Sequence, residues 1–268
     1  MGTIRDDVKD TIEYLNTNNV YSCGRIYQTS NEEIEELYSS IDFNGKKVLS
    51  VLASGDQPLM AYLSGAKKVD LFDINKLTLH YYFIRLWTLK YFHTFYPEPF
   101  LCKEYIYALL KIVKPESEQE VYSINYWKEL LPKLKDYEFL MLFFSIGNCI
   151  QLDRNKIDRL TSIITKEKPT FYNIDISKAN NLNEKYDVII TSNIADWLSA
   201  DGGYFRIYKN NMDRLLNSNG IVLCSNLGTA APKPGERFIF EESFDYYEIP
   251  GKSDGSFNYV PGYKYVKR

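Results

Sequence analysis

The sequence predicts an α/β protein with a doubly wound, mostly parallel seven-stranded sheet, N-terminal helices and a helical insertion. Two observations predict this class. Short apolar runs alternate with segments of helical periodicity, and several of these runs end in small polar or acidic residues. The expected strands are 47–52, 68–72, 170–174, 186–191, 221–225, 237–248 and 259–267.

The N-terminal residues precede the first expected strand. Residues 4–17 and 31–40 repeat apolar side chains at helical spacing, and Asn31 is a suitable N-cap for the second helix. Asn44-Gly45 then predicts a turn. We therefore expect residues 1–46 to form a helical cap, with an α/β domain over residues 47–268.

The next segment predicts the first half of a nucleotide-binding sheet. Its order is strand, small-residue loop, helix, strand, acidic residue and helix, as in a doubly wound fold. The corresponding parts are the strand 47–52, the loop Ala53–Asp56, the helix 58–63, the strand 68–72, Asp73 and the helix 76–92.

A helical insertion is expected at about 93–168, where prolines separate segments of helical periodicity at 101–113, 124–135 and 152–164. After it, strands resume, with a helix expected over 203–217. The tail, near 237–267, is typical of an antiparallel hairpin.

Composition and charge exclude several classes of protein. The 268 residues carry 32 Lys+Arg against 35 Asp+Glu, a formal charge of −3, so no nucleic-acid partner is expected. His80 and His93 are the two histidines, which excludes a three-histidine metal site, and the four cysteines form no Cys-x-x-Cys pair. No apolar run reaches the roughly 18 residues of a membrane helix, and residues 1–20 lack the apolar run of a signal peptide, so we expect neither segment. We expect a cytoplasmic protein without a metal, in an oligomeric state that the sequence leaves open.

The loop Ala53-Ser54-Gly55-Asp56 is the most informative motif. A dinucleotide site uses Gly-x-Gly-x-x-Gly so that backbone amides approach a pyrophosphate, whereas this loop has one glycine followed by a carboxylate. Asp56 would repel a pyrophosphate, which disfavours a nicotinamide-dependent oxidoreductase, and would attract a cation. S-adenosyl-L-methionine fits, because it carries a sulfonium and an ammonium and lacks phosphate. Asp56 could equally cap the helix that begins at Gln57.

Polar residues also follow the other expected strands. Asp73 lies where an acid binds the vicinal hydroxyls of a ribose, although it could instead cap the following helix. Asp175 could accept a hydrogen bond from an adenine amine, while Ile74 and Ile176 could enclose the ring. Ser192 and Asn193 follow the fourth strand. Together these strand ends predict one adenosine-binding cleft.

With this pattern, the chain from Lys47 to about Ser225 resembles the class I S-adenosylmethionine-dependent methyltransferases, and the tail fits their last two strands. The resemblance implies that Ala53–Asp56 hold the methionine moiety, that Asp73 binds the ribose and that Asp175 lies near adenine. The chain departs from the usual pattern because it lacks Gly-x-Gly.

A narrower resemblance accounts for this departure. The motifs Val48-Leu49-Ser50-Val51-Leu52-Ala53-Ser54-Gly55-Asp56-Gln57, Asp73-Ile74-Asn75 and Ser192-Asn193-Ile194-Ala195-Asp196-Trp197 are similar to those of the betaine-lipid synthesis family. Enzymes of that family move the 3-amino-3-carboxypropyl group of S-adenosylmethionine onto diacylglycerol. Tyr21-Ser22 also resembles its N-terminal motif, but Arg25, Tyr27, Gln28 and Thr29 replace the expected acidic and aromatic residues.

The sequence therefore predicts a transferase that uses S-adenosylmethionine on a small-molecule or lipid-like acceptor. The cofactor supplies the activated carbon, so the protein mainly orients the nucleophile. Asp196 and Tyr21 are the candidate catalytic bases, with His80 and His93 as further possibilities. The alternative is a catalytically silent protein of the same fold that binds the cofactor or a protein partner.

Overall fold

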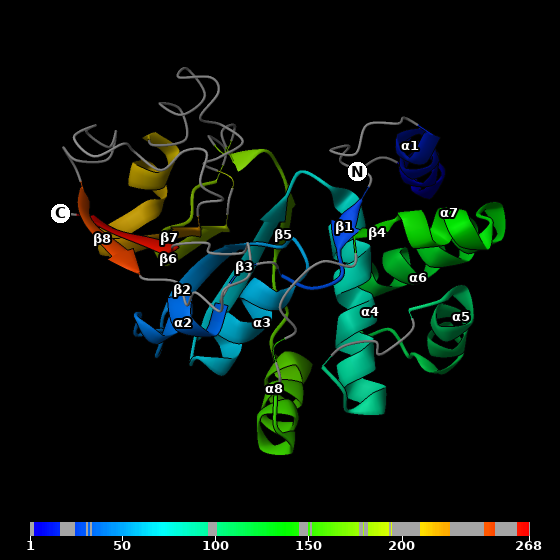
Figure 1. The fold of residues 1–268 in the computed structure, drawn as a ribbon, viewed down its shortest axis with the longest axis horizontal. Coiled ribbons are helices and arrows are strands. Elements are labelled where there is room, and N and C mark those ends of the chain that lie inside the picture. The colour runs from blue at the N-terminus through cyan, green and yellow to red at the C-terminus, as the bar shows by residue number, and fades with distance from the viewer. Residues whose placement is uncertain are drawn as a thin grey trace, which may run out of the picture. The chain divides into compact units, whose positions relative to one another are not determined.

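The computed structural model of the chain describes residues 3–16, 25–30, 32, 34–95, 101–144, 150, 152–176, 179, 182–192, 194, 210–225, 244–249 and 262–267. The chain divides into two compact units, which are drawn in Figure 1. We call Met1–Ser30, Leu52–Gly55 and Ile74–Lys168 the helical unit, and Asn31–Val51, Asp56–Asp73 and Pro169–Arg268 the sheet unit.

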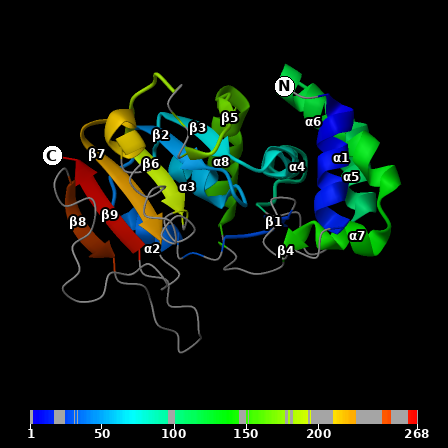
Figure 2. The same cartoon turned by 90° about the horizontal axis from the view of Figure 1, so that it is seen from above.

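The sheet unit contains a seven-stranded sheet of order β5-β3-β2-β6-β7-β9-β8, so the predicted fold class is confirmed. The first five strands pair in parallel, and β9 pairs antiparallel with both β7 and β8, as Figure 2 shows. The strands are β2 (Lys47–Val51), β3 (Lys68–Asp73), β5 (Phe171–Asn173), β6 (Tyr186–Ser192), β7 (Leu216–Ser225), β8 (Phe244–Ile249) and β9 (Gly262–Lys267).

Strand β2 lies at the point where the strand order reverses. Val48 pairs with Val69 of β3 on one side and with Val188 of β6 on the other, and all three side chains are fully buried. Such apolar strands, buried on both faces, are typical of parallel sheets. In doubly wound sheets the ligand binds outside the carboxyl ends of the strands at this reversal, which here is the β2–β6 pair.

Two helices of the sheet unit lie close to β2 in sequence. Helix α2 (Ile34–Ser39) contacts α3 (Asp56–Leu63), and α3 contacts both β2 and β3. The helix predicted over residues 31–40 is α2, which starts at Ile34 rather than at residue 31. Asn31, its predicted N-cap, lies outside the described residues.

Strand β7 differs from the prediction. It begins at Leu216, whereas the strand was expected at 221–225, so the helix expected over 203–217 ends at Leu215. The register between β6 and β7 shifts between the Tyr186–Leu216 and Val188–Ile221 pairs, and this bulge accommodates the extra residues. Residues 201–209 lie outside the described part.

The helical unit is built around α4 (Lys76–Phe92), which contacts α5, α6 and α8, while α1 contacts α6. A short parallel pair joins β1 to β4. The remaining elements are α1 (Ile4–Asn16), β1 (Ile26–Tyr27), α5 (Lys103–Ile112), α6 (Glu118–Leu130), a 3-10 turn (Leu131–Lys133), α7 (Asp136–Met141), β4 (Phe143–Phe144) and α8 (Arg154–Lys166).

The three helices expected within 93–168 are present as α5, α6 and α8. Helix α6 begins at Glu118 rather than at 124, because the Ser117 side chain accepts a hydrogen bond from the backbone N–H of Glu120 and caps the helix earlier. Its C-terminal end passes into the turn that contains Pro132.

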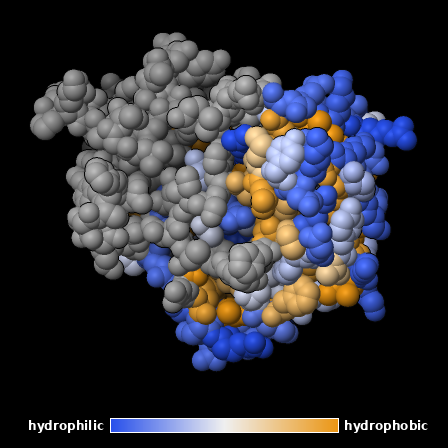
Figure 3. Space-filling model, turned by 45° about the vertical axis from the view of Figure 1, so that its right-hand side comes forward, coloured by the Kyte–Doolittle hydropathy of each residue, from blue (hydrophilic) through white to orange (hydrophobic). Residues whose placement is uncertain are grey.

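The surface of the described part mixes hydrophobic and hydrophilic residues, as Figure 3 shows for one face. Helix α7 contributes Tyr137 and Leu140 to the exposed hydrophobic side chains. Within the described ranges, no helix has both the length and the apolar character needed to cross a membrane.

Candidate functional site

The loop Leu52–Gly55, which belongs to the helical unit, is a tight turn with unusual backbone angles. Ala53 has φ 43° and Gly55 has φ 87°, and the Gly55 N–H donates to the Leu52 carbonyl over 2.6 Å. A Cβ at position 55 would lie 3.0 Å from the Tyr82 ring. Glycine is therefore required at 55, and residues held at positive φ are concentrated at functional sites.

Arg85 of α4 supports this loop and was not predicted from the sequence. Its side chain is 0% exposed, its Nη1 donates to the Ser54 carbonyl over 2.7 Å, and its guanidinium lies 4.7 Å from the centre of the Phe95 ring. A buried arginine of this kind requires partners, which the loop carbonyl provides. The sequence alone does not distinguish Arg85 from Lys76 and Lys90, two lysines of the same helix that are partly exposed.

In the sheet unit, Asp56 is fully buried and is the first residue of α3. The structure thus starts the helix at Asp56 itself, where a negative charge favours the helix dipole. The neighbouring Tyr38 hydroxyl donates to the Gln57 carbonyl over 2.9 Å. Burial raises the pKa of Tyr38 well above its usual value, and the charges of Glu32 and Asp56 raise it further.

Glu32 connects the start of α3 to the end of β6. Its carboxylate accepts hydrogen bonds from the Gln57 side-chain amide over 3.2 Å and from the Ser192 hydroxyl. Glu32 is 3% exposed, and Ser192 is buried at a positive φ of 53°. Glu32 could not be predicted from the sequence, because it lies in a polar stretch between Asn31 and Glu33 and has no feature that separates it from a solvated helix start.

Asp73 is the last residue of β3, as predicted, and is 9% exposed. Its backbone carbonyl accepts hydrogen bonds from the Asn173 side chain and the Ile174 N–H, over 3.0 and 3.1 Å. The cap of α4 is Asn75, whose side chain accepts from the Leu77 N–H over 3.0 Å. Asp73 is therefore not the residue that caps α4, and the alternative in which its carboxylate serves as that helix cap is wrong.

The two isoleucines that could enclose an adenine ring differ in exposure. Ile74 is 59% exposed in the helical unit, whereas Ile176 is 2% exposed in the sheet unit, where its carbonyl accepts from the Asn211 side chain over 2.9 Å. Asp175, just before Ile176, is half-buried. In this structure, Ile74 presents an open apolar surface and Ile176 is already covered by protein.

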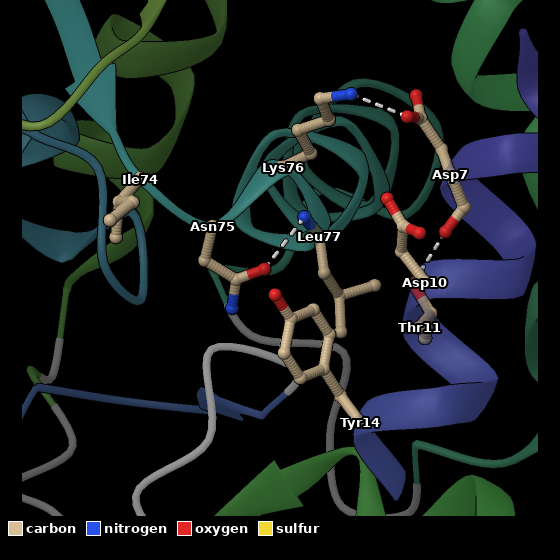
Figure 4. Close-up of a pocket in the computed structure, with 8 residues that line it drawn as sticks. All are labelled: Asp7, Asp10, Thr11, Tyr14, Ile74, Asn75, Lys76 and Leu77. Carbon is tan, nitrogen blue, oxygen red and sulfur yellow. Dashed lines mark hydrogen bonds and ion pairs between the residues drawn. The ribbon is translucent and has the colours of Figure 1, made fainter. Parts of the chain in front are cut away.

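A cavity of about 160 Å³ lies within the helical unit, between α1 and the start of α4 (Figure 4). Asp7 on its wall accepts hydrogen bonds from Lys76 and, over 2.6 Å, from the Tyr122 hydroxyl. These contacts fix α1 to α4 and α6. The cavity is lined by Asp7, Asp10, Thr11, Tyr14, Ile74, Asn75, Lys76 and Leu77.

Three predicted site residues lie outside the described part of the chain, namely Tyr21, Asn193 and Asp196. Among the residues that are described, no three His, Cys, Asp or Glu side chains gather as ligands of a metal ion would.

Comparison of the sequence with protein-family models and with curated proteins yields no match. Among solved structures, the chain is similar to the rRNA methyltransferase AviRa from Streptomyces viridochromogenes, with 10% identity, a TM-score of 0.48 and coverage of 95% of this chain and 92% of that chain. It is also similar to the N-methyltransferase NodS from Bradyrhizobium japonicum in complex with S-adenosylhomocysteine, with 11% identity, a TM-score of 0.44 and coverage of 97% and 98%. At this level of similarity, neither match carries a conclusion about the chemistry of this chain.

Proposed function

We propose that this protein binds S-adenosyl-L-methionine and transfers a group from it to a small-molecule or lipid-like acceptor. One observation carries the proposal: adjacent parallel strands of the sheet unit end in, or are followed a few residues later by, polar and acidic residues. These residues are Asp175 after β5, Asp73 on β3, Asp56 after β2 and Ser192 on β6.

The chemistry of these residues fits a phosphate-free adenosine cofactor. Asp73 is suited to accept hydrogen bonds from both ribose hydroxyls, and Asp175 to accept one from the adenine amine. A buried carboxylate at Asp56 opposes a pyrophosphate and favours a cation. Ala53, Ser54 and Gly55, which follow β2 in the sequence, and Ile74, which follows Asp73, remain predicted cofactor-binding residues.

The sulfonium of the cofactor makes its methyl and γ-carbons electrophilic, so either a methyl or a 3-amino-3-carboxypropyl group could be transferred. The protein's part is to bind the cofactor, orient the acceptor and exclude water. Asp196 and Tyr21 remain the predicted bases for an acceptor that must lose a proton. The formal charge of −3 supports a small acceptor rather than a polynucleotide.

Isothermal titration of the full-length protein with S-adenosylmethionine and S-adenosylhomocysteine tests the cofactor. We expect micromolar binding, and we expect Asp73→Ala to weaken it by about 1–3 kcal/mol, since the ribose loses a charged acceptor. Asn75→Ala is the control, because it removes the α4 cap and leaves the β3 carboxylate in place. Absence of binding to the wild type, or unchanged affinity in Asp73→Ala, would overturn the proposal.

The by-product separates the possible reactions. After incubation with a candidate acceptor, S-adenosylhomocysteine indicates methyl transfer, whereas methylthioadenosine indicates aminocarboxypropyl transfer, as the resemblance to the betaine-lipid synthesis family implies. Binding without either by-product across amine, thiol, hydroxyl and diacylglycerol acceptors would favour the catalytically silent alternative.

A further inference from the structure

We propose that the cavity between α1 and the start of α4 binds a small alkylammonium, a compound with a compact apolar body and one protonated amino group. The cavity belongs to the helical unit alone, because every residue that lines it is part of that unit. The inference goes beyond the proposed function and does not depend on it, since no part of S-adenosylmethionine enters the argument.

The charges on the wall of the cavity favour a cation. Two carboxylates, Asp7 and Asp10, and one ammonium, Lys76, line it, so the lining carries a net charge of −1. Lys76 is paired with Asp7, which leaves the charge of Asp10 unbalanced. Asp10 has neither a hydrogen bond nor an ion pair with any residue that the structure describes. The adjacent cation on α1, Lys9, is paired with Glu13 over 3.4 Å.

Other polar groups of the wall are engaged within the protein. The Thr11 hydroxyl donates to a backbone carbonyl one turn earlier on α1, over 3.0 Å. The Asn75 side chain accepts from the Leu77 N–H over 3.0 Å and donates to the Arg25 carbonyl over 3.2 Å. A ligand can therefore donate to the Asp10 carboxylate without displacing any of these bonds, and a charge-assisted hydrogen bond of this kind is among the stronger ones.

Apolar surface beside Asp10 favours an organic cation over an inorganic one. Figure 4 shows the side chains of Asp10 and Tyr14 extending from α1 toward α4, where Ile74 and Leu77 add aliphatic wall. Aliphatic side chains suit an alkyl group, and the face of an aromatic ring attracts a cation. A calcium or magnesium ion needs about six oxygen ligands, and the described side chains supply no cluster of that kind.

The size of the cavity restricts the ligand to a small compound. Its volume of about 160 Å³ corresponds to roughly five water molecules. An alkyl group of a few carbons together with an amino group fits this space. The compound tert-butylammonium has these features and serves as the probe.

Three compounds that share the tert-butyl group and differ in charge provide the test. They are tert-butylammonium, neutral tert-butanol and anionic pivalate. In NMR titrations of the full-length protein without cofactor, tert-butylammonium should bind with a dissociation constant on the order of millimolar, as expected for so small a ligand. It should shift the amide signals of residues 7–14 and 74–77. The other two compounds should bind at least about threefold more weakly, because they lack the attraction to Asp10.

Asp10→Asn should weaken the binding of tert-butylammonium by about threefold to tenfold and leave that of tert-butanol unchanged, because it removes the charge and keeps the shape. Glu13→Gln is the matched control, since it removes one exposed carboxylate from the same helix outside the cavity. It should change the affinity by less than about twofold, because solvent and salt screen that charge.

Three outcomes would overturn the inference: tert-butanol or pivalate binding as tightly as tert-butylammonium, equal losses in Asp10→Asn and Glu13→Gln, or shifted signals that lie outside α1 and the start of α4. The comparison of the three compounds on the wild type decides the matter even if a variant fails to fold. Because the titration contains no cofactor, its result is independent of whether the protein binds S-adenosylmethionine.

Discussion

The imidazole of His80 stacks on the ring of Tyr126, with 3.7 Å between the ring centroids and 14° between the planes. Its Nδ1 lies 2.9 Å from the Ser123 hydroxyl, and its buried Nε2 has no hydrogen-bond partner among the described residues. Burial lowers the pKa of His80, the Asp7 carboxylate opposes this shift and Lys76 adds to it, with the net result that the pKa falls to about 3. His80 is thus a neutral core histidine of the helical unit.

The stability of the protein should therefore fall as the pH is lowered. The unfolded chain binds a proton at His80 near pH 6.5, whereas the folded chain binds it only near pH 3, so stability is lost between these values. From about pH 8 to about pH 5, this residue should account for about 2 kcal/mol of the unfolding free energy. Urea unfolding at both pH values, for wild type and His80→Gln, measures the difference.

The second histidine provides the control for this experiment. His93 ends α4 at φ 53° and is half-exposed, and His93→Asn keeps a residue that tolerates this backbone. His93→Asn is therefore measured under the same two conditions, as a replacement of a histidine that lies outside the core. A His80→Gln variant with the same loss between the two pH values as wild type would contradict the prediction.

Replacing Gly55 should disturb the loop more than replacing Gly45. Both glycines have positive φ, 87° and 71°, but a Cβ at 55 would lie 3.0 Å from the Tyr82 ring and one at 45 would meet nothing within 4 Å. We expect Gly55→Ala to lose about 1–3 kcal/mol more unfolding free energy than Gly45→Ala, because it adds a clash to the shared backbone strain. Denaturant unfolding of both variants measures this, and equal losses would contradict it.

Arg85→Met should loosen the loop Leu52–Gly55. The variant keeps a long apolar stem but leaves the Ser54 carbonyl without the guanidinium donor that now lies 2.7 Å away. We expect a loss of about 1–3 kcal/mol in stability, together with faster amide exchange at residues 53–55. Lys90→Met, at the partly exposed end of the same helix, is the control. An unchanged amide exchange rate at residues 53–55 in Arg85→Met would show that Arg85 does not stabilise the loop.

Tyr122→Phe should weaken the attachment of α1. The Tyr122 hydroxyl donates to the buried Asp7 carboxylate over 2.6 Å, and its removal leaves that carboxylate with one donor fewer. We expect a loss of about 1–3 kcal/mol in unfolding free energy. Tyr137→Phe, on an exposed residue of α7, should change stability by less than about 0.5 kcal/mol. Similar small effects of the two variants would show that the contact contributes little.

The fold could be predicted because its strands are defined locally. The apolar runs around Val48 and around Val188 are typical of buried parallel strands, and Asn44-Gly45 is typical of a turn. Asp73 ends its strand as expected. The start of β7 at Leu216 could not be predicted, because Asn217 to Gly220 is typical of a turn and the pairing with β6 supplies the deciding hydrogen bonds. Asn219 keeps a positive φ of 60°, as a turn residue does, so only the pairing of Leu216 with Tyr186 assigns this segment to the strand.

The candidate site could be predicted only where its residues follow strands. Asp56, Asp73 and Ser192 were predicted from their place after apolar runs. Arg85 and Glu32 were missed because their burial arises from contacts with residues 31 and 160 positions away, Ser54 and Ser192 respectively. The sequence around these two residues has no pattern that distinguishes a buried charge from a solvated one.

The division of the chain has a practical consequence for dissecting the protein. The polypeptide passes between the two units at residues 30–31, 51–52, 55–56, 73–74 and 168–169, so neither unit is a continuous segment. Terminal truncation therefore cannot isolate the sheet unit, and a fragment ending at residue 168 would omit five of the seven strands of the sheet while retaining the whole helical unit. Genetic separation of the two units would require circular permutation or grafted linkers that replace the short crossings around residues 52–55 and 73–74.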